Sequence, residues 1–289
     1  MHHADYKTIL SPQNGMNLFR GCIHGCIYCD SRSICYQINH DFEDIEIKRD
    51  AVEILERQLK RKRKRGMIST GAMCDPYMHL PETLAITRRC LQAILEHGFG
   101  LAIQTKSAGI LRDMDILKAI HEKARCVVEM TLTTYDEDLC KKIEPNVSTS
   151  LDRFHALEAF RDAGIPTVVW LSPILPFIND TEENLRGLLD YIIRAGVAAV
   201  LSFGFGVTMR EGNREYFYAK LDESFPGMKE RYIKQFAYAY ECMSKNNTAL
   251  TGILKQECAK HGILCGTDEV FAFIRQFEPP QIETQLELF

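Results

Sequence analysis

Three cysteines lie close together near the start of the chain, at positions 22, 26 and 29, in the pattern C-x3-C-x2-C. Cysteine thiolates are ligands of zinc ions and of iron–sulfur clusters. A structural zinc site takes four protein ligands, and Cys35 would supply the fourth. A [4Fe–4S] cluster held only by Cys22, Cys26 and Cys29 would leave one iron open to a substrate or a cofactor. The spacing alone leaves both kinds of site as alternatives.

The composition indicates thiols that stay reduced. The 289 residues include 11 cysteines, an odd number, and the first residues lack the basic region and apolar stretch of a signal peptide. A chain of this length buries enough surface to fold without disulfides. We therefore predict a cytoplasmic protein whose cysteines are free or bound to metal.

Charge and hydropathy exclude two other classes of protein. With 46% hydrophobic residues, 26% charged residues and a net charge of −4, the chain does not have the composition of a disordered protein. No apolar run reaches the about 18 residues that a membrane-spanning helix needs, so we expect no membrane partner.

Apolar strands alternate with amphipathic helices over most of the sequence. Strands are predicted at residues 15–20, 66–71, 101–105, 126–132, 166–174 and 197–207. Helices are predicted between them at residues 48–65, 82–97, 111–123, 150–163 and 181–195. This alternation is typical of parallel βαβ units, and the continuous apolar strands indicate a sheet covered on both faces. The sequence thus predicts an α/β fold of about six strand–helix units.

Beyond residue 212 the pattern becomes helical, with helices predicted at residues 228–242, 248–261 and 268–277. We interpret residues 211–289 as a helical C-terminal extension on a core that covers residues 10–210. Because no low-complexity linker separates them, residues 1–289 are predicted to form a single domain. Residues 279–289, which begin with two prolines, are predicted to be a loosely held tail.

The cysteine motif, with the aromatic Tyr28 before its last cysteine, resembles that of the radical S-adenosylmethionine (SAM) superfamily. The resemblance implies a partial (β/α)6 TIM-type barrel with the cluster loop after the first strand. It also implies that Cys22, Cys26 and Cys29 hold a [4Fe–4S] cluster whose open iron binds the amino and carboxylate groups of SAM. An electron from a reductant such as flavodoxin or ferredoxin would then generate a 5′-deoxyadenosyl radical.

Further motifs resemble the spore photoproduct lyase-like group of this superfamily. They include Cys74-Asp75-Pro76-Tyr77, Thr105-Lys106-Ser107 and Ile143-Glu144-Pro145. The best-known member of the group repairs a thymine dimer in spore DNA. The resemblance implies a lyase-like enzyme that abstracts a hydrogen atom from an organic substrate, with nucleic acid as the leading candidate. The alternatives are a peptide or small-molecule substrate, or a non-catalytic iron–sulfur electron-transfer protein.

Cys74 is the candidate catalytic residue. In the lyase, a cysteine in a comparable stretch before an aspartate donates a hydrogen atom, and Met73-Cys74-Asp75 resembles that stretch. Cys74 follows the second predicted strand, and barrel active sites are built at the carboxyl ends of strands. Much of the wider group has threonine or serine at this position. A role in packing or in the SAM pocket is therefore the alternative for Cys74.

Polar residues at the end of the third predicted strand are candidates for binding SAM. Thr105, Lys106 and Ser107 would offer a cation and hydroxyls to the SAM carboxylate and ribose. The alternative is a serine that caps a helix and a lysine that is exposed.

Other cofactor-binding candidates come from the positions that match the family. Gly71, Ala72 and Asp75 occupy the place where radical SAM proteins have a glycine-rich turn against the methionyl amine, although the common Gly-Gly-Glu is missing. Tyr28 belongs to the same group by its place in the cysteine motif.

Glu129 and Thr131 share one face of the fourth predicted strand. A buried carboxylate needs a partner. The two side chains point either into the barrel, toward SAM, or outward to the helices, and we expect the barrel side because a charge on the helix side costs more.

Two further sets of residues are candidates for contact with a substrate. A run of six consecutive cations predicts phosphate binding, or otherwise a solvated helix end, and consists of Lys60, Arg61, Lys62, Arg63, Lys64 and Arg65. Cations and aromatic residues also follow the sixth predicted strand, namely Arg210, Arg214, Tyr216 and Tyr218. Packing in the core is the alternative for the two tyrosines.

Overall fold

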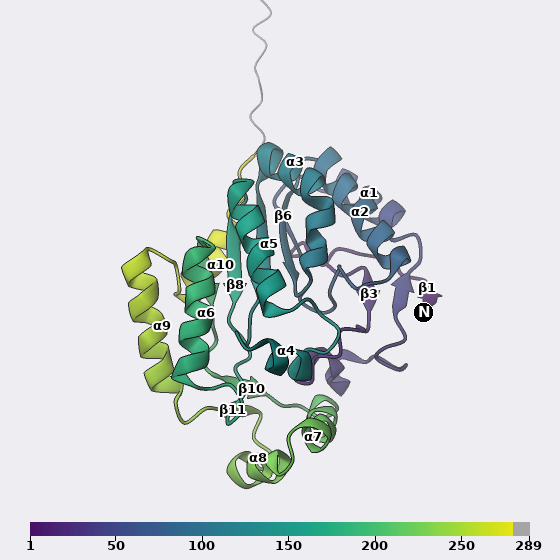
Figure 1. The fold of residues 1–289 in the computed structure, drawn as a ribbon. Coiled ribbons are helices and arrows are strands. Elements are labelled where there is room, and N and C mark those ends of the chain that lie inside the picture. Colours follow the sequence, from purple (N-terminus) through teal and green to yellow (C-terminus); the bar gives the residue numbers. More distant parts are fainter. Residues whose placement is uncertain (280–289) are drawn as a thin grey trace, which may run out of the picture.

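A parallel sheet of six strands forms the centre of the computed structural model, which describes residues 1–279. The strands lie in chain order, which is the order of a (β/α) barrel (Figure 1). They are β2 (Gly15–Met16), β5 (Met67–Thr70), β6 (Gly100–Thr105), β7 (Cys126–Thr131), β8 (Thr167–Trp170) and β9 (Ala199–Leu201). The predicted α/β class and the partial barrel are confirmed.

Helices cover the outer face of this sheet (Figure 1). They are α1 (Ala51–Arg61), α2 (Pro81–Glu96), α3 (Met114–Ala124), α5 (Ser150–Asp162) and α6 (Glu182–Arg194). Alternate strand residues such as Ile68, Val128 and Val169 are fully buried in the core that these helices share. Both faces of the strands are apolar because the opposite face is covered as well.

Helix α10 (Thr267–Arg275) fills the inner side of the barrel. Its Val270 and Ile274 pack in one cluster with the inward-facing Ala102, Val127 and Val168. The C-terminal part of the chain therefore completes the hydrophobic core of the barrel, which supports our proposal of a single domain.

Two of the predicted strands are divided in the structure. Residues 15–20 form β2 and then β3 (Phe19–Arg20), and β3 joins a separate sheet with β1 (His2–Ala4) and β4 (Glu46–Lys48). Residues 197–207 form β9 and then β10 (Gly206–Thr208), which pairs antiparallel with β11 (Glu241–Met243). Gly204 separates them with a φ of +92°, which is incompatible with a continuous strand.

The C-terminal extension is not wholly helical. It contains α7 (Asn213–Ser224), α8 (Met228–Phe236), β11 and α9 (Asn247–His261). The helix predicted over residues 228–242 ends early because Ala237 adopts a φ of +47° and the chain then enters β11. Short elements that we did not predict are α4 (Glu137–Ile143), η1 (Asp30–Arg32), η2 (Ile34–Tyr36) and η3 (Ala108–Asp113). The predicted tail lies almost wholly outside the described residues.

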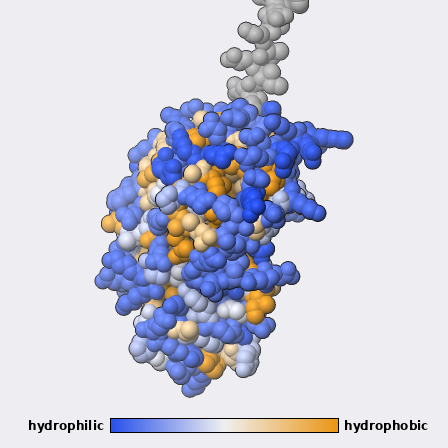
Figure 2. Space-filling model, turned by 90° about the vertical axis from the view of Figure 1, so that its right-hand side faces the viewer, coloured by the Kyte–Doolittle hydropathy of each residue, from blue (hydrophilic) through white to orange (hydrophobic). Residues whose placement is uncertain are grey.

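Among the described residues, no helix is both long and apolar enough to cross a membrane. The face seen in Figure 2 is mostly hydrophilic, with hydrophobic side chains in scattered patches, as is normal for a protein surface. Three exposed aromatic side chains come from the segment after β9, and these are Phe203, Tyr238 and Tyr240.

Candidate active site

A cavity of about 620 Å³ lies at the carboxyl ends of the barrel strands. Its wall combines the cysteine loop (residues 21–29), the segments that follow β5 and β6, the ends of β7 and β8, and residues 203–208 and 240–243. This volume is in the range of small-molecule sites, and barrel enzymes build their active sites at this end.

The cysteine loop brings all three motif cysteines to the cavity wall. Gly21 starts it with a φ of +85°, and a Cβ there would lie 2.4 Å from the carbonyl oxygen of Phe42, so no larger residue fits. The same oxygen accepts a hydrogen bond from the Cys22 N–H at 2.9 Å. The loop follows β3, which has left the barrel sheet, instead of following a barrel strand directly as we predicted.

The zinc alternative does not fit the geometry. Cys35 is exposed, does not line the cavity, and has its sulfur 3.3 Å from Arg210 Nη1. The fourth ligand of that alternative therefore does not lie with Cys22, Cys26 and Cys29.

Lys106 presents a cation to the same cavity. Burial disfavours its charge, but Cys26, Glu144 and Asp75 outweigh that effect and raise the pKa of Lys106. Its Nζ has no hydrogen bond or ion pair within residues 1–279 and lies 6.0 Å from the centre of the Tyr28 ring. A half-buried ammonium that has no partner among the described residues is suited to binding a carboxylate. The predicted alternative of an exposed lysine is not what the structure has.

Asp75 lines the cavity, but its carboxylate is already hydrogen-bonded to neighbouring residues of the protein. Its carboxylate accepts hydrogen bonds from Thr105 Oγ1 at 2.7 Å, the Lys106 N–H at 2.7 Å and the Tyr77 N–H at 2.9 Å. It thereby joins the segments after β5 and β6. These contacts favour a positioning role for Asp75 over direct contact with the methionyl amine.

The remaining candidates after β5 and β6 differ in their access to the cavity. Gly71 and Ala72 line it, and Gly71 passes so close to β6 that a Cβ would lie 1.9 Å from the Gln104 carbonyl oxygen. Thr105 and Ser107 are buried outside its wall. Ser107 accepts a hydrogen bond from the Gly109 N–H and caps η3, which is the helix-cap alternative.

Glu129 and Thr131 lie on the inner face of β7, as expected, on the same side as Val127. Thr131 reaches the cavity wall, and its buried Oγ1 has no partner among the described residues. Glu129 lies outside the wall, where it accepts a hydrogen bond from Trp170 Nε1. Burial raises the pKa of Glu129 to about 7.

Cys74 lines the cavity together with the motif cysteines. It is buried, and burial raises the pKa of its thiol to about 12, as it does for Cys26. Cys74 therefore keeps its S–H at neutral pH. It also packs in the main core with Phe19, so the packing alternative has support as well.

A buried ion pair that we did not predict is hydrogen-bonded to the cysteine loop through Tyr28. We call Tyr28, Glu144 and Arg153 the buried clamp. Arg153 pairs with the Glu144 carboxylate, which also accepts the Tyr28 hydroxyl, and Arg153 Nη1 donates to the Thr131 carbonyl oxygen at 2.7 Å. Burial alone would raise the pKa of Glu144, but Arg153 and Lys106 outweigh it and lower that pKa. The clamp thus joins the cysteine loop to α5 and β7.

His24 is a second site residue that the sequence did not single out. Its side chain is 2% exposed, its Nδ1 lies 3.4 Å from Asp75 Oδ2, and its ring lines the cavity. The Nε2 atom is buried and has no partner among the described residues. The only signal for it was its place between two motif cysteines.

The cationic run over residues 60–65 does not border the cavity. It spans the end of α1 and the start of the connection to β5, at the amino ends of the strands. Lys62 contacts Asn14, and a Cβ at Gly98 would lie 3.3 Å from Arg65 Cζ. Any phosphate bound there would lie at the opposite end of the barrel from the cysteines.

A comparison with protein families agrees with this site. Residues 16–192, more than half of the chain, match the model of the radical SAM superfamily. The chain belongs to the radical SAM superfamily, whose members use a [4Fe–4S] cluster, SAM and an external reductant. The predicted [4Fe–4S] cluster and SAM are the cofactors of this superfamily.

Curated relatives carry no assigned function. An uncharacterized protein of Mycobacterium tuberculosis is 28% identical over 223 residues, which are 75% of this chain and 65% of that protein. The chain therefore spans less than two thirds of the length of this relative. An uncharacterized protein of Methanocaldococcus jannaschii is 29% identical over 58% of this chain and 62% of its own length.

Solved structures share the fold. Spore photoproduct lyase with bound SAM and a dinucleoside spore photoproduct matches with a TM-score of 0.60 and 14% identity, over 86% of this chain and 74% of that one. The peptide-bound SuiB of Streptococcus suis is more distant, and in its SAM-bound form it matches with a TM-score of 0.50 and 13% identity, over 86% and 49% of the two chains.

Proposed function

We propose that the protein is a radical SAM enzyme that abstracts a hydrogen atom from a nucleic-acid substrate, in a reaction like that of spore photoproduct lyase. The bound cluster and SAM supply the radical chemistry. The observation that carries the proposal is the one cavity that brings together three motif cysteines, the Lys106 ammonium and the buried Cys74 thiol.

Different residues of the cavity are proposed to bind the cluster and SAM. Cys22, Cys26 and Cys29 hold the cluster. Lys106 takes the SAM carboxylate, because its ammonium has no partner within residues 1–279. The buried Nε2 of His24 and Oγ1 of Thr131 lack partners in the described part of the chain. Since unpaired buried polar atoms are costly, a polar cofactor that satisfies them fits this wall.

Cys74 is proposed to return a hydrogen atom to the substrate. Its S–H bond breaks, the hydrogen atom passes to the carbon radical on the substrate, and the unpaired electron stays on sulfur. Burial supports this role because the thiol remains protonated. Replacing Cys74 with Ala should leave SAM cleavage intact and change the product, whereas unchanged products would exclude the role.

Aromatic side chains at the cavity support a nucleic-acid base as the substrate. Trp170, Phe203 and Tyr240 line the cavity, and Phe203 is 55% exposed. Arg210 donates to the Tyr240 hydroxyl at 2.8 Å with its guanidinium 5.0 Å from the ring centre. Aromatic rings beside arginine are typical platforms for unstacked bases. The spore photoproduct lyase neighbour, with its dinucleoside ligand, supports the same choice.

A peptide or small molecule is the second candidate. It is favoured by Asp30 and Glu241, whose side chains also line the cavity and would repel phosphates. The cationic run at residues 60–65 does not offset this effect because it lies at the other end of the barrel.

The test is anaerobic reconstitution with dithionite, SAM and either ultraviolet-irradiated or untreated oligonucleotides. We expect 5′-deoxyadenosine in both reactions and a new nucleic-acid product only with the irradiated strand. The variant with Cys22, Cys26 and Cys29 replaced by Ala should lose its cluster iron and its activity. If SAM is cleaved but neither strand changes, the nucleic-acid proposal fails and the second candidate stands. Reduction by flavodoxin and by ferredoxin is compared in the same assay.

A further inference from the structure

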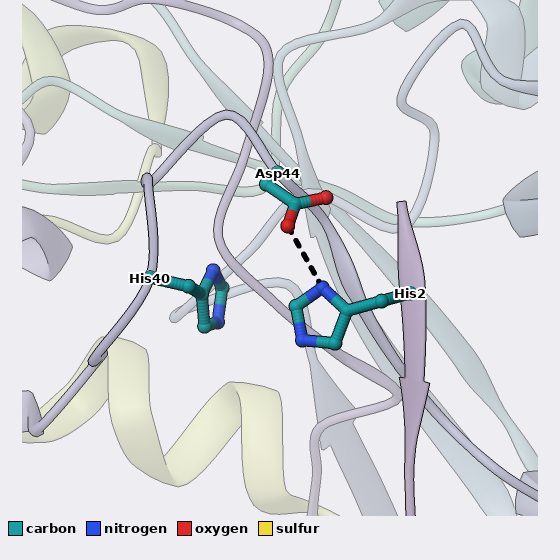
Figure 3. A group of neighbouring side chains, drawn as sticks. All are labelled: His2, His40 and Asp44. Carbon is teal, nitrogen blue, oxygen red and sulfur yellow. Dashed lines mark hydrogen bonds and ion pairs between the residues drawn. The ribbon is translucent and has the colours of Figure 1, made fainter.

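A second group of metal-ligating side chains lies outside the cavity wall. His2, His40 and Asp44 each place one ligand atom within 4.8 Å of the other two. Figure 3 shows the three side chains pointing toward one another, with His2 on β1 and the other two on the segment before β4. Within residues 1–279, no other three His, Cys, Asp or Glu side chains meet this distance.

The hydrogen bonds of His40 leave one ring nitrogen available as a ligand. Nδ1 lies 2.9 Å from the Asp41 carbonyl oxygen, which can only accept, so Nδ1 carries the proton. Nε2 then presents a lone pair, is buried, and has no hydrogen-bond partner among the described residues. Its nearest carboxylate oxygen, Glu46 Oε2, lies 4.0 Å away. A histidine whose other N–H is held by a backbone carbonyl is the usual arrangement at metal sites.

His2 is oriented in a comparable way by a carboxylate. Its Nε2 lies 3.5 Å from Glu46 Oε2, and Glu46 is itself held by the Tyr6 hydroxyl and by Arg20, whose Nε is 3.7 Å away. The Nδ1 of His2 donates to Asp44 Oδ2 at 2.9 Å, and a metal ion bound to both atoms would take the place of this proton. Glu46 would then hold the remaining proton on Nε2, as carboxylate–histidine pairs do at metal sites.

We propose that His2 Nδ1, His40 Nε2 and Asp44 Oδ2 bind a divalent transition-metal ion, with zinc as the expected species. Two nitrogen or oxygen ligands on zinc lie at most about 4.2 Å apart. The group therefore closes around an ion with a small side-chain movement. The other Asp44 oxygen stays 2.8 Å from the backbone nitrogen of Met1. Three protein ligands leave a fourth position for water.

The position of this zinc site links it to the cysteine loop. Phe42 lies between His40 and Asp44 in the sequence, and its carbonyl oxygen accepts the Cys22 N–H. Both histidines and Asp44 retain some exposure, with side chains 39%, 17% and 42% exposed, so an ion can enter from solvent. Bound zinc would fix β1 against the segment that supports the loop.

The test is zinc retention by the cluster-loaded protein. The protein is equilibrated with zinc, desalted and analysed for zinc and iron by mass spectrometry. We expect one retained zinc per chain, and less than a tenth of that in His40→Gln and in Asp44→Asn, at equal iron content. His3→Gln is the matched control, because His3 lies on the same strand but contacts Glu82 at 3.0 Å. Retention that is unchanged in both ligand variants, or absent from the wild type, would overturn the proposal.

Zinc X-ray absorption on the same sample distinguishes this site from the thiols. We expect nitrogen and oxygen scatterers near 2.0–2.2 Å with imidazole outer shells, at roughly the distances of protein zinc sites. A sulfur shell near about 2.3 Å would place the ion on cysteines and refute the assignment.

Discussion

Two glutamates of the barrel are both buried, and their pKa values are shifted in opposite directions. Glu144 is paired with Arg153 in the buried clamp, and its pKa is lowered. Among the described residues Glu129 has one hydrogen-bond donor, the indole N–H of Trp170, and burial raises its pKa to about 7. Burial alone therefore favours the uncharged form of Glu129, whereas the Arg153 guanidinium keeps the buried Glu144 charged. The charged Glu144 therefore supports the cysteine loop, whereas Glu129 in the barrel interior can lose its charge.

Removing the cation of the clamp should have the largest effect. Arg153→Met leaves Glu144 buried without its partner, and breaking a buried pair costs about 3–5 kcal/mol of unfolding free energy. We also expect loss of cluster iron, because Tyr28 in the cysteine loop shares the same carboxylate. Urea unfolding and iron analysis measure both effects.

Arg161→Met on the same helix is the matched control, since Arg161 is partly exposed and its ion pairs contribute little. The double variant Glu144→Leu with Arg153→Met should recover most of the stability, because no unpaired charge remains. A cost for Arg153→Met no greater than that for Arg161→Met would contradict the role of the clamp.

The uncharged state of Glu129 predicts a pH dependence of stability. The folded protein keeps this proton up to about pH 7, whereas the unfolded chain releases it near its ordinary pKa of 4.5. Between these values the folded state binds more protons, so stability falls as the pH rises, by roughly 3 kcal/mol in total. Urea unfolding of wild type and Glu129→Gln across this range measures the difference, and equal slopes would exclude the assignment.

The contrast between the two glutamates was not visible in the sequence. The spacing of the three cysteines, the six strands of the central sheet and the inward face of β7 follow from local sequence patterns and were predicted. The partners of the glutamates were not, because Arg153 meets Glu144 across the turn between α4 and α5, and Trp170 meets Glu129 across neighbouring strands. The β10–β11 pair was missed for the same reason, since its strands have only three residues each and their partners are far apart in the sequence.

Lys106 is the charged residue that we propose binds SAM directly, in the same cavity as the cysteine loop. Lys106→Met removes the unpaired ammonium and should weaken SAM binding roughly ten- to hundredfold, because a charged hydrogen bond contributes about 1.5–3 kcal/mol. Isothermal titration of the cluster-loaded, unreduced protein with SAM measures this without turnover. Lys48→Met is the control, since Lys48 is a buried lysine that is not part of the cavity wall. An unchanged SAM affinity in Lys106→Met would remove this role.

The smallest predicted effect concerns the hydrogen bond that Glu129 receives from Trp170. This bond lowers the pKa of Glu129 against the larger effect of burial, so Trp170→Phe should move the midpoint of the pH dependence upward. The expected shift is up to about one pH unit, since a hydrogen bond contributes about 0.5–1.5 kcal/mol. Because the phenyl ring keeps most of the packing against Phe203 and Phe271, the loss of packing should change stability at all pH values equally. The same substitution in a Glu129→Gln background should produce no shift in the midpoint, and a shift that persists there would assign the pH dependence to another group.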